Sequence, residues 1–135
     1  MNPRTSIPTD IQFPEIYHQV CKVLTKEDFA NIWVVGGVIR STILNHPVDD
    51  LDFIIQGNAL ACARHVADKL NADYFTLDAK RGVGRVLLRD QARTVIDISR
   101  LHSNGIEADM LARDFTINAM AIRCQNPKQI VDPTR

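Results

Sequence analysis

A series of short apolar runs, each closed by turn residues, constrains the fold of this chain more than any other feature. The runs are "NIWVVGG" (31–37), "LDFII" (51–55), "DYFTL" (73–77), "VGRVLLR" (83–89) and "RTVIDISR" (93–100). Their length, their β-branched and aromatic content and their polar or glycine-containing boundaries are typical of β-strands. The last three follow one another with only short polar stretches between them, which predicts a β-meander.

Apolar residues at helical spacing lie before and between these strands. One set recurs at intervals of three and four, which predicts a first amphipathic helix: Phe13, Ile16, Tyr17, Val20 and Leu24. Asn58 can cap a second helix over residues 59–71. The predicted inward stripe of that helix is Leu60, Ala63, Val66, Ala67 and Leu70.

The remaining segments complete a mixed pattern. Residues 38–45 and 106–115 have helical spacing, residues 117–124 read as a last strand, and residues 125–135 are expected to trail off without regular structure. Helices and strands alternate early in the chain, and strands predominate later. This order predicts an α+β fold, with a mixed sheet and helices on one side, rather than a fully parallel wound sheet.

Length and composition place the chain among single-domain globular proteins. A chain of 135 residues predicts one domain, with residues 1–12 as an extended lead-in and 13–135 as the folded unit. Lys plus Arg and Asp plus Glu each number 16, so no overall field attracts nucleic acid or an anionic membrane. Neither a membrane span nor a signal peptide is indicated, and a cytoplasmic location is expected. Cys21, Cys62 and Cys124 are expected to be reduced thiols.

Acidic residues gather at the start of the second strand, in "VDDLDFII" (48–55). Because side chains alternate across a strand, Asp50 and Asp52 share one face, while Leu51 and Phe53 point to the other. Two such carboxylates repel each other unless a cation lies between them, and a hard divalent ion prefers their oxygens. On its own, so short a pattern is more often a solvated strand edge. The neighbouring segments are needed to distinguish a metal site from that alternative.

The segment "VVGGVIR" (34–40) favours a binding site over a solvated strand edge. Gly36 and Gly37 lie between a predicted strand and a predicted helix, where backbone N–H groups can bind an anion. Arg40, one turn later, can add a planar fork of donors to a phosphate. A Gly-Gly turn alone also has a steric explanation. Together with the aspartate pair it predicts a metal and triphosphate site.

A third carboxylate usually completes the metal shell of such a site. Asp97, in "TVIDIS" (94–99), is the candidate, because it interrupts an apolar strand that could run beside residues 51–55. The alternative is an exposed position, since Val95, Asp97 and Ser99 share one face of an alternating strand.

Three segments together resemble the head domain of class II tRNA nucleotidyltransferases and bacterial poly(A) polymerases. They are "WVVGGVIRSTIL" (33–44), "DDLDFII" (49–55) and "ARDFTINAMAI" (112–122). In that family a Gly-Gly-x-x-Arg-Asp segment precedes an Asp-x-Asp strand, and an Arg-Arg-Asp-Phe-Thr-x-Asn-Ala segment follows downstream. The resemblance runs from about residue 32 to residue 121, and "VDPTR" (131–135) is similar to the segment where family heads end. It implies a polymerase-β-like nucleotidyltransferase fold.

The resemblance also implies an activity and its residues. The chain would transfer CMP or AMP from CTP or ATP to the 3′ end of tRNA, with Mg²⁺ as cofactor. Asp50 and Asp52 would be catalytic and hold the metal, and the triphosphate would be bound by Gly36, Gly37 and Arg40. This reading keeps two alternatives: poly(A) addition, or a magnesium-binding fold with no RNA substrate.

The downstream segment supplies further candidates. By resemblance, Arg113, Asp114 and Asn118 would contact the nucleotide sugar and phosphates, and the alternative is a buried polar network that ties the last helix to the sheet. Arg81 and Arg85, in "KRGVGR" (80–85), are expected to face solvent, with phosphate or RNA contact as the alternative.

Three departures from the family pattern stand against full activity of these residues alone. Ser41 replaces the usual Asp, and Ala112 replaces the first Arg of the Arg-Arg pair. No Glu-Asp-x-x-Arg segment, which selects the incoming base in the family neck, is present. The neck, body and tail domains would therefore have to be supplied in cis or in trans. A non-catalytic interaction or regulatory module that kept the fold is the competing interpretation.

Overall fold

The computed structural model describes residues 13–26, 30–35, 50–91, 93–102, 105, 106, 108, 121–124 and 126–131. These residues form two helices and seven strands: α1 (Glu15–Lys26), β1 (Ala30–Val35), β2 (Asp50–Gln56), α3 (Ala59–Lys69), β3 (Asp73–Asp78), β4 (Val83–Leu87), β5 (Val95–Arg100), β6 (Ala121–Arg123) and β7 (Asn126–Val131). The predicted lead-in (1–12) and the predicted helix over 38–45 lie outside the described residues, and most of the predicted helix over 106–115 does too.

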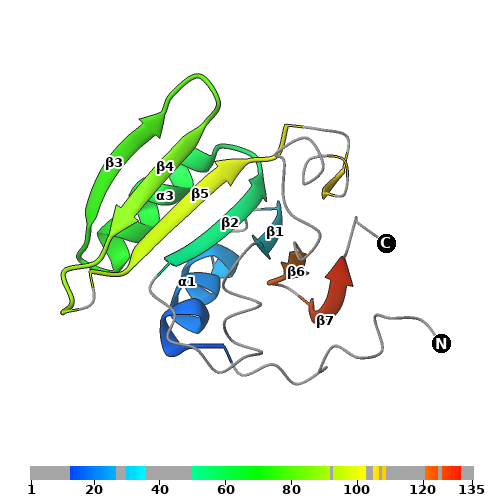
Figure 1. Cartoon of the computed structure of the whole chain (residues 1–135), viewed down its shortest axis with the longest axis horizontal. Helices are drawn as coiled ribbons and strands as arrows, with labels where there is room; N and C mark the ends of the chain where they lie inside the picture. The colour runs from blue at the N-terminus through cyan, green and yellow to red at the C-terminus, as the bar shows by residue number, and fades with distance from the viewer. Residues whose placement is uncertain are drawn as a thin grey trace.

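The strands form one mixed sheet in the order β3-β4-β5-β2-β1-β6-β7 (Figure 1). β2 and β5 run parallel, whereas the other neighbouring pairs run antiparallel. A parallel pair needs a long crossover connection, and α3, β3 and β4 supply it between β2 and β5. The predicted mixed sheet and the predicted β3-β4-β5 meander are confirmed.

The end of the chain differs from the sequence prediction. β6 covers only Ala121–Arg123 of the predicted last strand, and β7 then pairs with it in antiparallel fashion. The prediction that residues 125–135 lack regular structure is therefore wrong for 126–131. Pro127 argued against a strand here, because proline has no N–H to donate to a ladder. β7 accommodates it as the last strand in the order of the described sheet.

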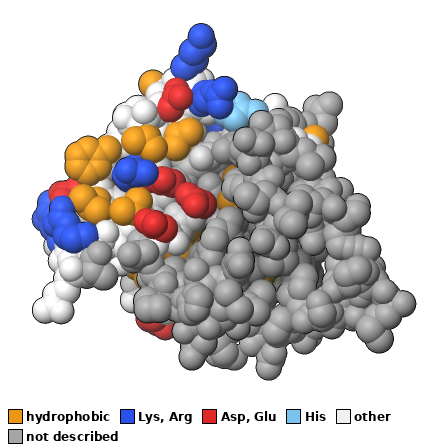
Figure 2. Space-filling model, viewed as in Figure 1, with side chains coloured by type: hydrophobic (Ala, Val, Ile, Leu, Met, Phe, Trp, Pro, Cys, Tyr) orange, Lys and Arg blue, Asp and Glu red, His pale blue; other side chains and the backbone are white. Residues whose placement is uncertain are grey.

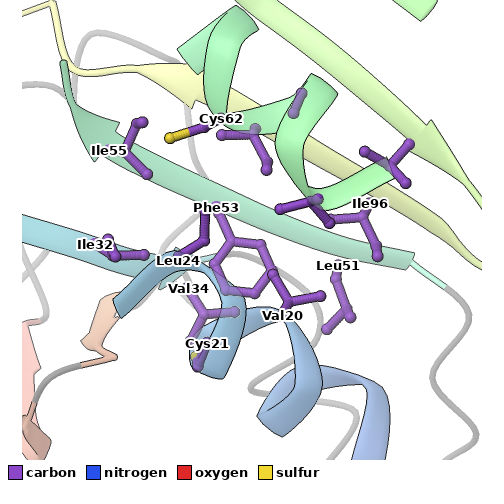
Figure 3. Close-up of a cluster of buried hydrophobic side chains, with 14 of the residues drawn as sticks. Val20, Cys21, Leu24, Ile32, Val34, Leu51, Phe53, Ile55, Cys62 and Ile96 are labelled. Atoms are coloured by element: carbon purple, nitrogen blue, oxygen red, sulfur yellow. The ribbon is translucent and has the colours of Figure 1, made fainter. Parts of the chain in front are cut away.

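Both helices pack on the same face of the sheet and enclose the main core. In Figure 3, Phe53 of β2 points into a cluster that includes Val20 and Leu24 of α1. The ring of Phe53 lies 6.1 Å from that of Tyr17, with the two planes nearly parallel. Of the predicted first-helix stripe, all members are buried except Ile16, which is partly buried and packs against the same cluster. Within the described residues, no helix is long and apolar enough to cross a membrane.

Helix α3 begins as predicted, but its buried stripe is rotated toward smaller residues. The Asn58 carboxamide oxygen accepts a hydrogen bond from the Ala61 backbone N–H at 3.0 Å, which confirms the cap. The buried residues are Ala59, Cys62, Ala63, Val66 and Ala67, whereas the predicted Leu60 and Leu70 are only partly buried. Small side chains on this face allow the helix to approach the sheet closely.

Gly84 of β4 is the sheet position that this approach requires. A Cβ added there would lie 2.7 Å from the Ala63 Cβ and 3.2 Å from the Tyr74 ring. Because the Ala63 Cβ is fixed to the helix backbone, a side chain at residue 84 would have to move α3 away from β4.

We expect Gly84→Ala to destabilise the fold by about 1–3 kcal/mol, the usual cost of overpacking. Chemical denaturation would measure the loss. Ala63→Gly should offset part of it in the double variant, judged against Ala63→Gly alone. Gly105→Ala is the matched control, because nothing lies within 4 Å of a Cβ at that position. An unchanged midpoint for Gly84→Ala would contradict the close packing of α3 on β4.

The cysteines are free thiols, in agreement with the sequence prediction. Cys21 of α1 and Cys124, which follows β6, are far apart in sequence, yet their Sγ atoms lie 2.6 Å from each other. Cys62 of α3 is fully buried in the core, and this burial raises its pKa from 9.0 to about 12.

Cys62 is therefore expected to resist alkylation while the chain is folded. A pKa raised from 9.0 to about 12 lowers the thiolate fraction at pH 8 roughly a thousandfold. Iodoacetamide labelling followed by peptide mass spectrometry, with and without denaturant, would measure this. The folded state holds the proton more tightly than the unfolded state, so stability should fall as the pH rises from about 9 toward 12. Cys62→Ala should weaken that fall, and rapid labelling of native Cys62 would contradict it.

Candidate active site

The Asp-x-Asp strand places its two carboxylates on the face of the sheet opposite the helices. Along β2, Leu51 and Phe53 are buried, whereas Asp50 is exposed and Asp52 is partly exposed. This alternation confirms the prediction that the two aspartates share a face. The same face carries a smaller apolar cluster that includes Val35 and Ile54. Asp50 and Asp52 thus stand beside a buried apolar patch but remain open to solvent.

Asp97 lies directly beside Asp52. The two residues are register partners in the parallel pairing of β2 with β5. Partners on adjacent strands are about 4.8 Å apart across the sheet and point to the same face. The prediction that the Asp97 strand runs beside residues 51–55 is confirmed, and three carboxylates gather on one face.

Arg85 of β4 continues the row on the far side of Asp97. The Arg85 Nε donates to Asp97 Oδ1 at 2.8 Å, and its Nη2 donates to Oδ2 at 3.0 Å. The side chains are 40% and 19% exposed, respectively. The hydrogen bond to Asp97 raises the pKa of Arg85; desolvation opposes it, and the charges of Asp97, Asp50 and Asp52 add to the increase. The guanidinium therefore sits in the field of all three carboxylates.

Arg81 is exposed as expected, whereas Arg85 is only partly open to solvent, because its guanidinium pairs with Asp97. The sequence carried a signal for the difference. In a β3-β4-β5 meander, the alternation of "VGRVLLR" puts Arg85 on the face opposite the buried Gly84 and Val86. That is the face that Asp97 occupies on the adjacent strand.

Figure 2 shows the same arrangement as a surface, with acidic side chains grouped around a basic one over the open face of the sheet. Hydrophobic side chains border the group (Figure 2). Phe75 and Leu77 of the edge strand β3 are 49% and 50% exposed. Phe75 is the register partner of Arg85. The polar site thus sits between an exposed apolar edge and the apolar patch at Val35.

The other predicted site residues lie outside the described residues, but the strand ends beside them are described. Gly36, Gly37 and Arg40 belong to the segment that follows Val35, and Val35 is the register partner of Asp52. The remaining candidates belong to the segment that precedes Ala121, which pairs with Val35: Arg113, Asp114 and Asn118. Both segments therefore join the sheet in the row that holds Asp52 and Asp97.

The carboxylates suit a hard divalent cation by their chemistry. Asp50 and Asp52 present oxygen ligands on a solvent-accessible face, which is the donor type that magnesium prefers. Across the described ranges, no group of three or more His, Cys, Asp or Glu side chains is arranged to hold a metal ion. The third carboxylate, Asp97, instead directs both oxygens to Arg85.

Asp50, Asp52 and Asp97 form an acidic row on one face of the sheet. The sheet order and this acidic row define an α+β nucleotidyltransferase fold. Residues 32–135 match the family described as the poly A polymerase head domain, and the chain belongs to this family. Its enzymes are metal-dependent nucleotidyltransferases.

Individual tRNA nucleotidyltransferases are similar to this chain. The CC-adding tRNA nucleotidyltransferase of Geobacter sulfurreducens is 36% identical over 101 residues, which cover 75% of this chain and 23% of that protein. The A-adding tRNA nucleotidyltransferase of Halalkalibacterium halodurans is 32% identical over 121 residues, covering 76% and 27%. A structure of the Thermotoga maritima CCA-adding enzyme complexed with tRNA superimposes with a TM-score of 0.72 at 28% identity, covering 95% of this chain and 31% of that one. The chain thus spans about a quarter of the length of the curated relatives it matches.

Proposed function

We propose that this chain is the catalytic head of a template-independent RNA nucleotidyltransferase that adds CMP or AMP, from CTP or ATP, to the 3′ end of tRNA. The observation that carries the proposal is the pairing of Asp52 with Asp97 in one row of the sheet, with Asp50 two residues away on the same face. The tRNA-directed names of the relatives support tRNA as the acceptor, and a cytoplasmic location goes with that role.

In this proposal Asp50 and Asp52 hold magnesium. The bound ion supplies positive charge that favours ionisation of the RNA 3′ hydroxyl and stabilises charge on the reacting phosphate. The two aspartates contribute by fixing oxygen ligands on a rigid strand, with a buried residue on either side of Asp52 to hold the backbone in place.

The remaining residues bind and orient the nucleotide. Backbone N–H groups of Gly36 and Gly37, together with Arg40, bind the triphosphate, and the downstream candidates bind the sugar and phosphates: Arg113, Asp114 and Asn118. The 3′ oxygen of the RNA forms a bond to the α-phosphorus. The bond from that phosphorus to the bridging oxygen breaks, and pyrophosphate leaves. The positions of Val35 and Ala121 in the Asp52 row support this grouping.

Base selection and the grip on tRNA are assigned to the rest of the protein, in cis or in trans. The chain covers 23% and 27% of the two named relatives. Its equal numbers of acidic and basic residues provide no overall attraction for RNA. Poly(A) addition is the second candidate, favoured by the description of the matched family.

One prediction of the proposed function concerns the metal site. Isothermal titration of Mg²⁺ with ATP or CTP into the chain should show binding that weakens at least about tenfold in Asp50→Asn and in Asp52→Asn, because each change removes a ligand charge. Asp68→Asn is the matched control, since Asp68 lies on α3, on the opposite side of the sheet. Metal-dependent nucleotide binding that is unchanged in both site variants would show that the assigned site is wrong.

Another prediction of the proposed function concerns catalysis. Exchanging the head of the Geobacter sulfurreducens relative for this chain should give a protein that incorporates labelled nucleotide into tRNA lacking its 3′ end. Asp52→Asn in the same chimera should lower the rate by a factor of about 10³ or more, as expected for a group needed in the transition state.

The same assay separates the competing functions. Extended tailing with ATP alone would favour poly(A) addition. A folded chimera without incorporation, while the unexchanged relative is active, would favour a non-catalytic module. Full activity of the 135 residues alone would contradict the need for other domains.

A further inference from the structure

Both carboxylate oxygens of Asp97 have an identified partner within this chain. Arg85 donates to Oδ1 at 2.8 Å and to Oδ2 at 3.0 Å, in a fork-to-fork arrangement. Charge-assisted pairs of this geometry are among the stronger hydrogen bonds in proteins. The pair is also partly shielded from water, since the Asp97 side chain is 19% exposed. A cation that recruits Asp97 must therefore compete with a well-formed contact.

The backbone around β4 and β5 holds the two side chains opposite each other. Arg85 and Asp97 are register partners in the antiparallel ladder. The turn that joins these strands is closed by Asp90, whose carboxylate accepts hydrogen bonds from the Thr94 N–H at 3.0 Å and from the Thr94 hydroxyl at 2.9 Å. The Leu88 N–H donates to the Thr94 carbonyl at 2.9 Å. These bonds fix the register, and with it the approach of the guanidinium to Asp97.

The direction of the contact separates Asp97 from its other neighbour. β5 lies between β4 and β2, so Arg85 and Asp52 approach Asp97 from opposite sides. Repulsion between the adjacent Asp52 and Asp97 carboxylates favours the side where the guanidinium lies. The guanidinium offsets one of the three negative charges, and the two that remain match the charge of one divalent cation.

We propose that Arg85 is a positioning residue that holds the Asp97 carboxylate away from the divalent cation at Asp50 and Asp52, so that the nucleotide-free chain binds this cation with two carboxylates rather than three. The inference rests on the proposed metal site. Its consequence is a weak cation site in the free chain. Magnesium held by one or two carboxylates completes its shell with water and substrate phosphates. Binding of magnesium to the site is therefore coupled to binding of the nucleotide.

Binding of Mn²⁺ without nucleotide tests this directly, because the free ion gives an electron paramagnetic resonance signal. We expect Asp97→Asn to change the dissociation constant less than twofold. Arg85→Gln should tighten binding about tenfold, since it releases Asp97 to the ion. In Arg85→Gln/Asp97→Asn most of that gain should disappear. Water-proton relaxation should count one fewer water on the bound Mn²⁺ in Arg85→Gln than in the wild type.

Controls separate release of Asp97 from loss of charge. Arg89→Gln breaks a comparable pair, since Arg89 Nη2 lies 2.6 Å from Asp73 Oδ1, and it should leave Mn²⁺ affinity unchanged. Arg85→Lys keeps the charge but cannot bind both oxygens in a fork. It should tighten binding by a few fold, and it serves as the second variant if Arg85→Gln does not fold, as judged by thermal unfolding.

Several outcomes overturn the proposal. A tenfold loss of affinity in Asp97→Asn would show that Asp97 is already a ligand in the free chain. Equal tightening by Arg85→Gln with and without Asp97, at an unchanged water count, would show a charge effect alone. Wild-type affinity in Arg85→Lys would also reject the positioning role. Failure of the proposed function looks different, because Mn²⁺ binding would then be absent, or would survive Asp50→Asn and Asp52→Asn.

Discussion

The parallel pairing of β2 with β5 is the constraint on which the arrangement of this site depends. It is the one parallel contact among the described strands, and it makes Asp52 and Asp97 register partners. An antiparallel arrangement of the same strands would have reversed the order of residues along β5 and so exchanged the partners of Asp50 and Ile54. The pairing exists because α3 carries the chain across one face and β3 and β4 return it to the centre of the sheet (Figure 1). Close packing of α3 on Gly84 is part of the same connection.

Like charges on adjacent strands are unfavourable, and the fold reduces this cost within the sheet. Arg85 pairs with Asp97, and solvent reaches Asp50 and part of Asp52. The helices cover the opposite face, so the apolar core forms there without burying these carboxylates. Acidic residues can thus interrupt a strand whose other face is among the most buried in the chain. The stability of the fold and the chemistry of the site use opposite faces of β2.

Sequence patterns predicted which face a residue occupies better than which residue it meets. Alternation alone put Asp50 and Asp52 together, because the side-chain period of a strand is two. It could not give the order of the whole sheet, which depends on packing. The predicted meander and the alternation put Arg85 and Asp97 on one face of adjacent strands, but they did not give the register that makes the two residues partners. Pro127 concealed β7 for a related reason, since only its place at the end of the sheet order allows a proline there. In α3 the pattern favoured Leu60 over Cys62, because hydrophobicity does not encode how closely a helix can approach.

The position of β1 determines where two segments that are distant in sequence are attached to the sheet. β1 lies between β2 and β6, so Val35 is the partner of Asp52 on one side and of Ala121 on the other. The segment with the double glycine begins after Val35, and the Arg-Asp-Phe-Thr segment ends before Ala121. The ladder hydrogen bonds of three adjacent strands set where each segment is attached to the sheet. The apolar pair Val35 and Ala121, both buried, therefore contributes to the geometry of the site although neither residue has any chemistry of its own.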